Sequence, residues 1–429
     1  MPRRLLRSPS LRLFTAFLVI YGLTAGVSLG RHSLAPHFVY LAEAFLHGRL
    51  DLIHVPAPPY DLTPFEGRWY VSFPPLPALL MLPLVALRGL AVSDIAFSIV
   101  LSALNVSLFY TVLTRLGIRD LRLGIWLCVL LGSGTPLWYC AALGSAWYTA
   151  HVVAVTCLCL YALEVLGQNR PLMTGLWLGL GFLTRAPALL AFPLTLALGL
   201  QKVRNLRDTA RFSLLLVLGM TPALVGQAAY NWARFGSPLE FGYRWMNSPG
   251  PLLERQATWG QFSLHFLPEN LYTLLIRPPL VSLSPLHIEP DPWGMGLLLT
   301  CPALLLALTH PRPSGTPSLS QNWEREGARG RARALCLGLW LSIALVQLPS
   351  LLYFNTGSYQ FGYRFALDWL PLGILLVAME IDGRLQWWSK ALIVASILMH
   401  LWGVLWMYPN FNGQPWHLQY VELWHQLLR

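Results

Sequence analysis

Long apolar runs, separated by short polar stretches, repeat along the whole chain. A helix that crosses a bilayer needs about 20 mostly apolar residues, and about eleven segments approach that length, several of them interrupted by Pro or Gly. They lie near 13–30, 94–114, 121–140, 147–166, 171–183, 187–200, 212–231, 293–309, 335–353, 366–381 and 391–408. The pattern predicts an all-α polytopic membrane protein in which residues 1–429 form a single integral membrane domain.

Arginine residues set the expected orientation. Residues 1–12 hold four arginines ahead of the first apolar segment, and cytoplasmic loops of membrane proteins are enriched in Lys and Arg. We therefore expect a cytoplasmic N-terminus. Alternation along the chain then places the basic runs at 115–122, 202–211 and 325–333 in the cytoplasm as well.

Residues 74–91 (PPLPALLMLPLVALRGLA) are apolar enough to span the membrane. Counting them as a span would place most of the basic residues outside, so we interpret them as a helix lying in the outer interface. A twelfth span is the alternative. The first segment also fits a cleaved signal sequence, because Ala25, Gly26 and Ser28 are small, and the remaining topology is the same in either case.

Two long loops are expected on the outer face, at 31–93 and 232–292, and most of the 19 acidic residues lie on or beside the outer loops. Any chemistry is therefore expected outside. By contrast, residues 310–334 are rich in Pro, Ser, Gly and Arg. We interpret this segment as a flexible cytoplasmic linker that touches anionic lipid.

Composition excludes several classes of protein. Only 11% of the 429 residues are charged, whereas soluble chains have about 25%. This excludes a water-soluble enzyme, a disordered chain and a nucleic-acid-binding domain, and the net charge of +11 is attributed to the cytoplasmic loops. All six cysteines lie in apolar runs, and no recurring His or acidic pair has metal-ligand spacing. We expect neither a metal nor another cofactor.

Residues 36–49 (PHFVYLAEAFLHGR) have the spacing of an amphipathic helix. Apolar residues recur at helical intervals from Phe38 to Leu46, and the opposite side carries His37 and Glu43. Such a helix lies on the membrane surface. Carboxylates and imidazoles are thus expected at the lipid boundary.

The order of these features resembles the GT-C superfamily of membrane glycosyltransferases, in particular its protein O-mannosyltransferase and aminoarabinose-transferase branch. The resemblance rests on the arginine-led first span and on the strings YLAEAFLHGRLDL (40–52), GRWYVSFPPLPALLMLP (67–83), GLWLGLGFLTRAPALLAFPL (175–194), YNWARFGSPLEFGY (230–243) and FGYRFALDWLPL (361–372). It implies a bundle of about eleven transmembrane helices with interfacial helices in the long first outer loop.

The resemblance also implies an activity. Similar proteins take a sugar from a polyprenyl-phosphate carrier and transfer it to a glycan, lipid or protein acceptor on the outer face, without a nucleotide-sugar site. This chain has no Gly-rich phosphate loop, which agrees with that expectation. The style of the resemblance points to a bacterial plasma membrane.

Two positions depart from the family pattern. The family's catalytic acidic residue lies four positions before the tyrosine that corresponds to Tyr40, and this position is Pro36 here. A lysine before the paired prolines, found in the aminoarabinose-transferase branch, is replaced by Phe73. Either another loop residue supplies the base, or the chain keeps the scaffold without that activity.

A substitute base must be a carboxylate or an imidazole that removes the acceptor proton. Asp61 is the first candidate, because it lies in a short polar stretch between the two interfacial segments, followed by Glu66 and Arg68 as candidate substrate contacts. Asp51 is the second candidate and His37 the third. Each of these residues also fits a solvated surface position.

Cations on the outer half of the chain are candidates for binding the phosphate. Arg185 lies in a tight turn between two apolar segments, where an arginine needs an anion or a carboxylate. Phe-Gly-Tyr-Arg occurs twice, and the pairs Tyr243/Arg244 and Tyr363/Arg364 both fall on outer loops. Tyrosine stacks on sugars and arginine binds phosphate in a bidentate manner. The alternative is that each pair anchors a helix end at the interface.

Asp368, four residues after Arg364, is a further candidate substrate contact, and the alternative is that it is the helical salt-bridge partner of Arg364. His151, in the apolar run beginning WYTAHVV, is expected near the outer end of its helix. Such a histidine either hydrogen-bonds across helices or borders the site cavity.

Two other functions compete with the transferase. A transporter or flippase for a lipid-linked glycan usually places ionisable residues near the bilayer midplane, and here the spans are nearly uncharged. A non-catalytic membrane protein that binds a glycolipid is the other alternative, since the usual acidic residue is missing.

Overall fold

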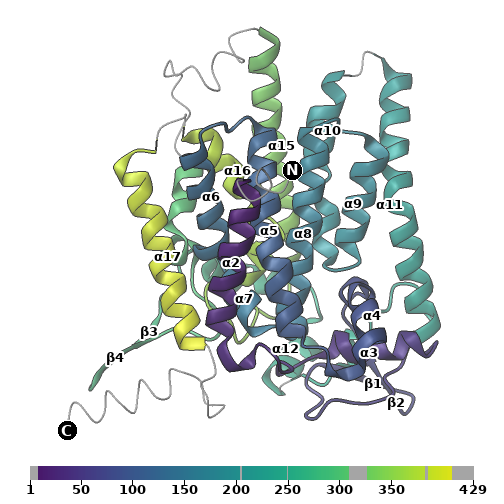
Figure 1. Cartoon of the computed structure of the whole chain (residues 1–429). Helices are drawn as coiled ribbons and strands as arrows, with labels where there is room; N and C mark the ends of the chain where they lie inside the picture. The colour runs from purple at the N-terminus through teal and green to yellow at the C-terminus, as the bar shows by residue number, and fades with distance from the viewer. Residues whose placement is uncertain (1–7, 203–204, 249, 309–325, 382–384, 408–429) are drawn as a thin grey trace.

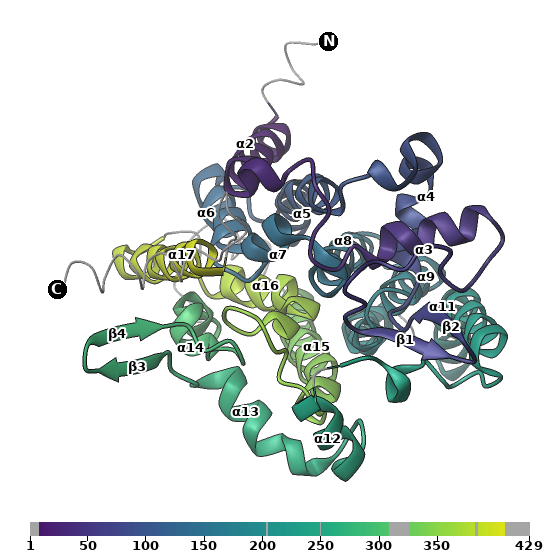
Figure 2. The same cartoon turned by 90° about the horizontal axis from the view of Figure 1, so that it is seen from below.

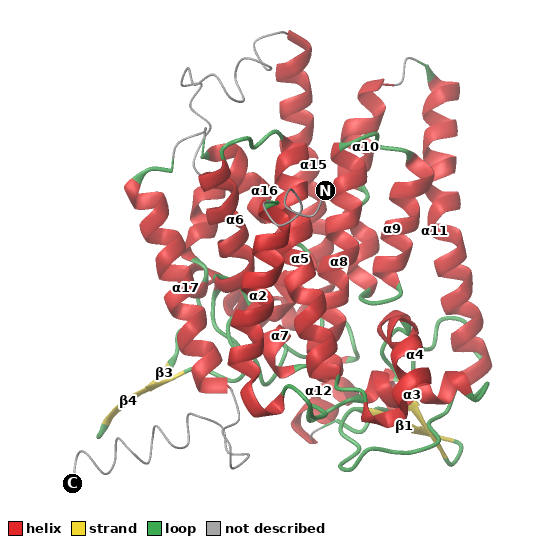
Figure 3. Ribbon diagram, in the orientation of Figure 1, coloured by secondary structure: helices red, strands yellow, loops and turns green. Residues whose placement is uncertain are grey.

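The computed structural model describes residues 8–202, 205–248, 250–308, 326–381 and 385–407. These residues form a bundle of helices with two small antiparallel hairpins (Figures 1 and 3). The chain is therefore mostly helical in its described part, as the apolar pattern predicts.

Five helices of the described part are long and apolar enough to cross a membrane. They are α5 (Asp94–Leu116), α8 (Ser145–Leu166), α11 (Leu206–Phe235), α15 (Glu326–Leu351) and α17 (Trp387–Met407). Helices α6 (Leu121–Ser133) and α7 (Leu137–Leu143) form a sixth candidate, bent by 52° at the break between them. These lengths and compositions identify an integral membrane protein.

The other expected segments coincide with shorter helices. They are α2 (Pro9–Ala25), α9 (Pro171–Phe182), η3 (Ala186–Ala191) with α10 (Pro193–Gly199) and η4 (Leu200–Lys202), α14 (Leu297–Thr300) with η7 (Pro302–Leu308), and α16 (Leu370–Glu380). Prolines in the first turn of α9, η3, α10 and α16 explain these starts, because proline lacks the N–H that would continue a preceding helix. The count of eleven spans stays a prediction.

The remaining elements gather at one end of the bundle, the lower end in Figure 1, which we call the site end. Its helices are η1 (Gly26–Ser28), α3 (His37–Leu46), α4 (Leu76–Arg88), η2 (Gly89–Ala91), η5 (Tyr243–Trp245), α12 (Gly250–Trp259), η6 (Leu264–Phe266), α13 (Leu267–Leu275) and η9 (Arg364–Asp368). Its strands are β1 (Leu62–Phe65), β2 (Arg68–Val71), β3 (Leu280–Leu283) and β4 (Leu286–Glu289). Both long loops expected on the outer face thus lie at this end.

Helix α3 lies across the ends of the long helices, as the views from the side and from below agree (Figures 1 and 2). Its face with Phe38, Leu41 and Ala42 is buried in a cluster with Met81 and Val85 of α4. At 13 residues, α4 is shorter than a straight span requires. The two helices pack together beside α8.

The core of the bundle is formed by α5, α8 and α16, whose inward side chains are fully buried. Helix α2 packs against α5, and its Tyr21 hydroxyl donates to the Gly132 carbonyl at 2.8 Å. Helices α9 and α11 approach closely through Gly175 and Gly219. The N-terminal helix is thus part of the packed bundle.

The end opposite the site end carries the connections that hold the basic runs 115–122 and 205–211 (Figure 1). Most of the predicted linker 310–334 lies outside the described residues. From Glu326 onward the chain is helical, as the first turns of α15. The tail after residue 407 also lies outside the described residues.

Candidate functional site

A cavity of about 920 Å³ opens among the loops of the site end. Besides Leu34, its walls come from five regions that are distant in the sequence: residues 60–74, the start of α8, residues 184–190, residues 239–262, and residues 349–365. Asp61, Arg185 and Arg364 all line it, together with many apolar side chains. Three residues predicted independently for the site are thus brought together.

Asp61 is held rigidly at the cavity wall. Its backbone adopts a left-handed φ of 52°, and its N–H donates to the Asn247 carbonyl at 3.0 Å. Its two carboxylate oxygens accept hydrogen bonds from Trp147 Nε1 and Ser248 Oγ, each at 2.8 Å. A carboxylate in this position has a fixed direction toward the cavity.

Burial raises the pKa of Asp61 above its ordinary value. The hydrogen bonds from Ser248 and Trp147 and the positive charge of Arg364 act in the opposite direction but do not cancel the effect of burial. A carboxylate with a raised pKa is a better proton acceptor than an ordinary one. The position of Asp61 at the cavity wall and its raised pKa therefore suit a general base.

The other two candidate bases do not line the cavity. His37 is buried, and its Nε2 donates to the Tyr60 carbonyl at 2.7 Å, while burial lowers its pKa to about 4. It thus supports the residue next to Asp61. Asp51 pairs with Arg49, and hydrogen bonding to this arginine lowers its pKa.

Glu66 and Arg68 lie on the β1–β2 hairpin and are exposed. Glu66 occupies the turn with a φ of 48°, and Arg68 Nη1 is 3.9 Å from Asp51. Neither residue is among those that line the cavity. Their predicted contact with substrate has no support from this placement.

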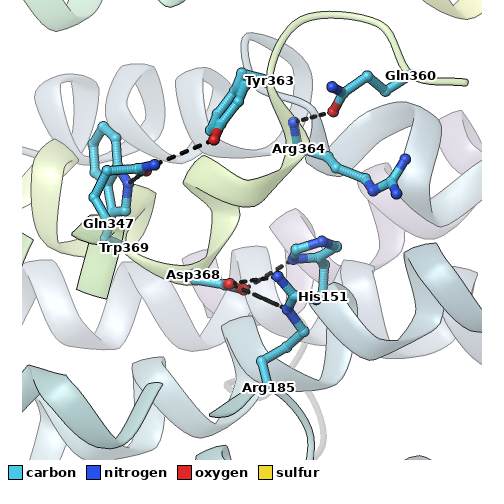
Figure 4. A network of polar contacts seen from close by, with 8 residues as sticks. All are labelled: His151, Arg185, Gln347, Gln360, Tyr363, Arg364, Asp368 and Trp369. Carbon is cyan, nitrogen blue, oxygen red and sulfur yellow. Dashed lines mark hydrogen bonds and ion pairs between the residues drawn. The ribbon is translucent and has the colours of Figure 1, made fainter. Parts of the chain in front are cut away.

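Asp368 lies behind the cavity wall and binds two partners (Figure 4). It accepts from Arg185 Nη2 at 3.0 Å and from His151 Nδ1 at 2.9 Å. The alternative in which Asp368 pairs with Arg364 is wrong: η9 is a short 3₁₀ helix, so Asp368 does not lie above Arg364 as it would on an α-helix. Arg185 thus faces the cavity with its charge balanced by a buried carboxylate.

The two Phe-Gly-Tyr-Arg copies have different environments. In the first, Tyr243 lines the cavity, and Arg244 pairs with Glu240 at 3.2 Å near the rim. In the second, Tyr363 is fully buried and its hydroxyl accepts from Gln347 at 3.3 Å (Figure 4). Tyr363 is therefore placed as a packing residue.

Arg364 differs from the other arginines of the cavity wall in its burial and its hydrogen-bond partners. It is only 6% exposed, and its Nη1 donates to the carbonyls of Gly357 at 2.7 Å and Ser358 at 3.1 Å. Within the described residues its Nε has no hydrogen-bond partner and no carboxylate pairs with it. Figure 4 shows its guanidinium directed away from the cluster of Asp368, Arg185 and His151. A buried guanidinium whose charge no carboxylate balances attracts an anion.

The two residues that hydrogen-bond to the Asp61 carboxylate were not predicted from the sequence. Trp147 lies one helical turn before His151, so the same helical spacing places it at the site end, and this signal was available. Ser248 reaches Asp61 from a loop 187 residues away in the chain. No sequence pattern marks such a contact.

Metal-ligand side chains do not converge within the described part of the chain, where no group of three or more His, Cys, Asp or Glu residues is found. The expectation of a metal-independent reaction remains a prediction.

Comparisons with known proteins give little further information. No family model matches the chain, and no curated protein matches it. A solved structure of the archaeal oligosaccharyltransferase AglB from Archaeoglobus fulgidus, in complex with an inhibitory peptide and a dolichol-phosphate, aligns with a TM-score of 0.44 and 14% sequence identity. The alignment covers 96% of this chain and 59% of that one. At this level the similarity assigns neither an activity nor a substrate to this chain.

Proposed function

We propose that this protein is a membrane glycosyltransferase of the GT-C type. In this proposal it transfers a sugar from a polyprenyl-phosphate carrier to an acceptor at the site end, with Asp61 as the general base. The donor is a substrate, and we propose no separate cofactor.

The proposal depends on one observation: Arg364, buried and without a carboxylate partner among the described residues, lines the same cavity as a carboxylate that suits a base. The Gly357 and Ser358 carbonyls accept from this guanidinium but do not neutralise its charge, and burial of such a charge costs several kcal/mol that an incoming anion would offset. Arg185 and Arg244 already have carboxylate partners. Arg364 is therefore the cation that we assign to the donor phosphate.

Apolar side chains supply a place for the carrier. Leu189, Leu190, Phe262 and Pro349 line the cavity beside the charged residues. A prenyl chain would bury its methyl branches against such a surface, and each buried CH₂ contributes about 0.8 kcal/mol. The combination of an apolar wall with a single phosphate-binding cation suits a lipid phosphate better than a free nucleotide.

The chemical step balances within this geometry. Asp61 accepts the proton of the acceptor hydroxyl while the acceptor oxygen forms a bond to the anomeric carbon. The bond between that carbon and the phosphate oxygen breaks, and the electron pair stays with the phosphate. The added negative charge on the leaving group is stabilised by Arg364.

Orientation follows from the basic residues. The described connections at the end opposite the site end hold Arg115, Arg119, Arg122, Arg207 and Arg211. The positive-inside rule places such loops in the cytoplasm. We therefore propose that the site end faces outward from a bacterial plasma membrane.

The test uses the full chain in proteoliposomes with a polyprenyl-phosphate sugar. Asp61→Asn should bind the donor normally but lose about 10²–10⁴-fold in transfer, the usual contribution of a general base. Arg364→Met should weaken donor binding, and Arg364→Lys should restore part of it because the charge returns. Asp51→Asn and Arg68→Met, both outside the cavity, are the matched controls.

Three results would change the assignment. Donor binding without transfer in the unaltered protein would indicate a non-catalytic glycolipid-binding protein. Movement of the intact donor across the membrane would indicate a flippase. Full transfer by Asp61→Asn would exclude Asp61 as the base.

A further inference from the structure

Two tyrosines line the cavity and remain unusually exposed. Tyr60 is 45% exposed and Tyr359 is 47% exposed, although both contribute to the wall. Neither hydroxyl makes a hydrogen bond within the described part of the chain. Their rings are therefore available to a ligand that enters the cavity.

The loop carrying Tyr359 is fixed in an unfavourable conformation. Tyr359 has a left-handed φ of 60°, which is rare for an aromatic residue, and its carbonyl accepts from the Tyr148 hydroxyl at 2.6 Å. Asn355 Oδ1 accepts from the N–H groups of Gly357 at 2.8 Å and Ser358 at 2.9 Å. Residues held in such regions often serve a ligand site.

Tyr60 is held in a comparable way. His37 Nε2 donates to its carbonyl, and the following residue is Asp61. The peptide group between Tyr60 and Asp61 is thus fixed by His37, and the Tyr60 ring extends from the residue directly before the proposed base. Tyr60 and Asp61 line the same cavity, so a ligand resting on this ring would share the cavity with the Asp61 carboxylate.

Neutral polar side chains complete this part of the wall. Gln261, Asn355 and Ser358 line the cavity together with the two tyrosines. The negative face of an aromatic ring attracts the C–H face of a sugar, and amide and hydroxyl groups bond to sugar hydroxyls. A cationic peptide would require a carboxylate besides Asp61, which the proposed reaction uses as the base, and Glu240, the other carboxylate of the wall, is already paired with Arg244.

We infer that Tyr60 and Tyr359 form the acceptor subsite and that the acceptor is an uncharged saccharide. This inference rests on the proposed transferase function, because it assigns the acceptor for the reaction at Asp61. The phosphate-binding Arg364 also holds the Tyr359 loop through the Gly357 and Ser358 carbonyls. Donor and acceptor sites thus share one rigid loop.

The test measures saccharide binding by saturation-transfer NMR on the full chain in lipid nanodiscs, which avoids sugar detergents. The probes are methyl glycosides and neutral linear oligosaccharides. Tyr359→Gly should weaken binding about tenfold, since glycine tolerates the positive φ and only the ring is lost. Tyr359→Phe should bind normally. Tyr60→Leu should also weaken binding, whereas Tyr272→Leu, an exposed tyrosine of α13 outside the cavity, should not.

Donor binding is measured in parallel with polyprenyl phosphate. Loss of saccharide binding with unchanged polyprenyl-phosphate binding in Tyr359→Gly supports the subsite. Equal saccharide binding by Tyr359→Gly and the unaltered protein would overturn it, as would polyprenyl-phosphate binding without any saccharide binding. A neutral peptide that competes for the tyrosines would assign a protein acceptor instead. Failure to bind polyprenyl phosphate would count against the transferase itself.

Discussion

Asp61 illustrates how far a single residue could be predicted. Its polar neighbourhood between two interfacial segments is visible in the sequence, and this was enough to select it ahead of Asp51. Its hydrogen bonds to Trp147 and Ser248 come from residues 86 and 187 positions away. Sequence spacing carries no record of such long-range contacts, so the restraint on Asp61 had to come from the structure.

Charge pairing was harder to predict. Helical spacing allows Asp368 to pair with Arg364, but it pairs with Arg185 across 183 residues. The local backbone is a 3₁₀ helix, whose three-residue turn moves the fourth residue off the same face. As a consequence Arg364 has no carboxylate partner in the described part of the chain, and this could not be predicted from the sequence.

Ser248→Ala should shift the pH dependence of transfer. The hydrogen bond from Ser248 lowers the pKa of Asp61, so its removal raises this pKa further. A base must be unprotonated, so activity falls as pH drops through that pKa, and in the variant the fall should begin at higher pH. The pH–rate profile measures this. Ser282→Ala on strand β3 is the control, and an unshifted acidic limb would count against Asp61 as the base.

Asp61→Asn should also affect stability. Because the pKa of Asp61 is raised on folding, the folded state prefers the neutral carboxyl, and the ionised form costs stability as pH rises through this pKa. The amide carries no charge and avoids the cost. We expect an equal or higher apparent Tm for the variant at pH 8, measured in detergent. A Tm that falls sharply would show that Asp61 has a structural role in the folded protein.

Individual elements follow sequence signals where these are strong. The Asn205 side chain caps α11, and Gly236 in the left-handed region ends it, as capping rules predict. The broken segments at 171–200 could be recognised from their prolines and glycines. How these short helices pack could not be predicted, because it depends on close backbone contact between α9 and α11.

Gly219→Ala should destabilise this contact. A Cβ at Gly219 would lie 2.2 Å from the Leu172 carbonyl oxygen, which cannot move without separating the two helices. Overpacking of this kind costs about 1–3 kcal/mol. Gly226 lies on the same helix with nothing within 4 Å, so Gly226→Ala should be neutral or stabilise by up to about 1 kcal/mol. Unfolding of both variants in detergent measures the difference, and equal stabilities would contradict the packing argument.

The whole molecule was predictable in class but not in shape. Low charge and repeated apolar runs were sufficient to identify a helical membrane protein. They could not show that residues 60–74, 184–190 and 349–365 surround one cavity, since this depends on the tertiary arrangement of broken helices.

The orientation of the molecule can be tested by cysteine labelling with a membrane-impermeant maleimide in intact cells. Glu66→Cys on the β1–β2 hairpin should be labelled, because it is exposed at the site end. Arg119→Cys, exposed at the opposite end, should react only after permeabilisation. The described native cysteines are largely buried, which keeps the background low. The reverse pattern would place the cavity in the cytoplasm and exclude an outward-facing reaction.

The pairing of Arg185 with Asp368 has a consequence for selectivity among carriers. Among the described residues of the cavity wall it leaves one guanidinium, that of Arg364, without a carboxylate partner, and this group lines the same cavity as the Asp61 carboxylate. A monophosphate diester brings one negative charge, which this guanidinium matches. A pyrophosphate-linked sugar brings two, and the second would repel Asp61 without a counterion. The protein should therefore select carriers first by the number of negative charges on the phosphate linkage, and only then by the identity of the sugar.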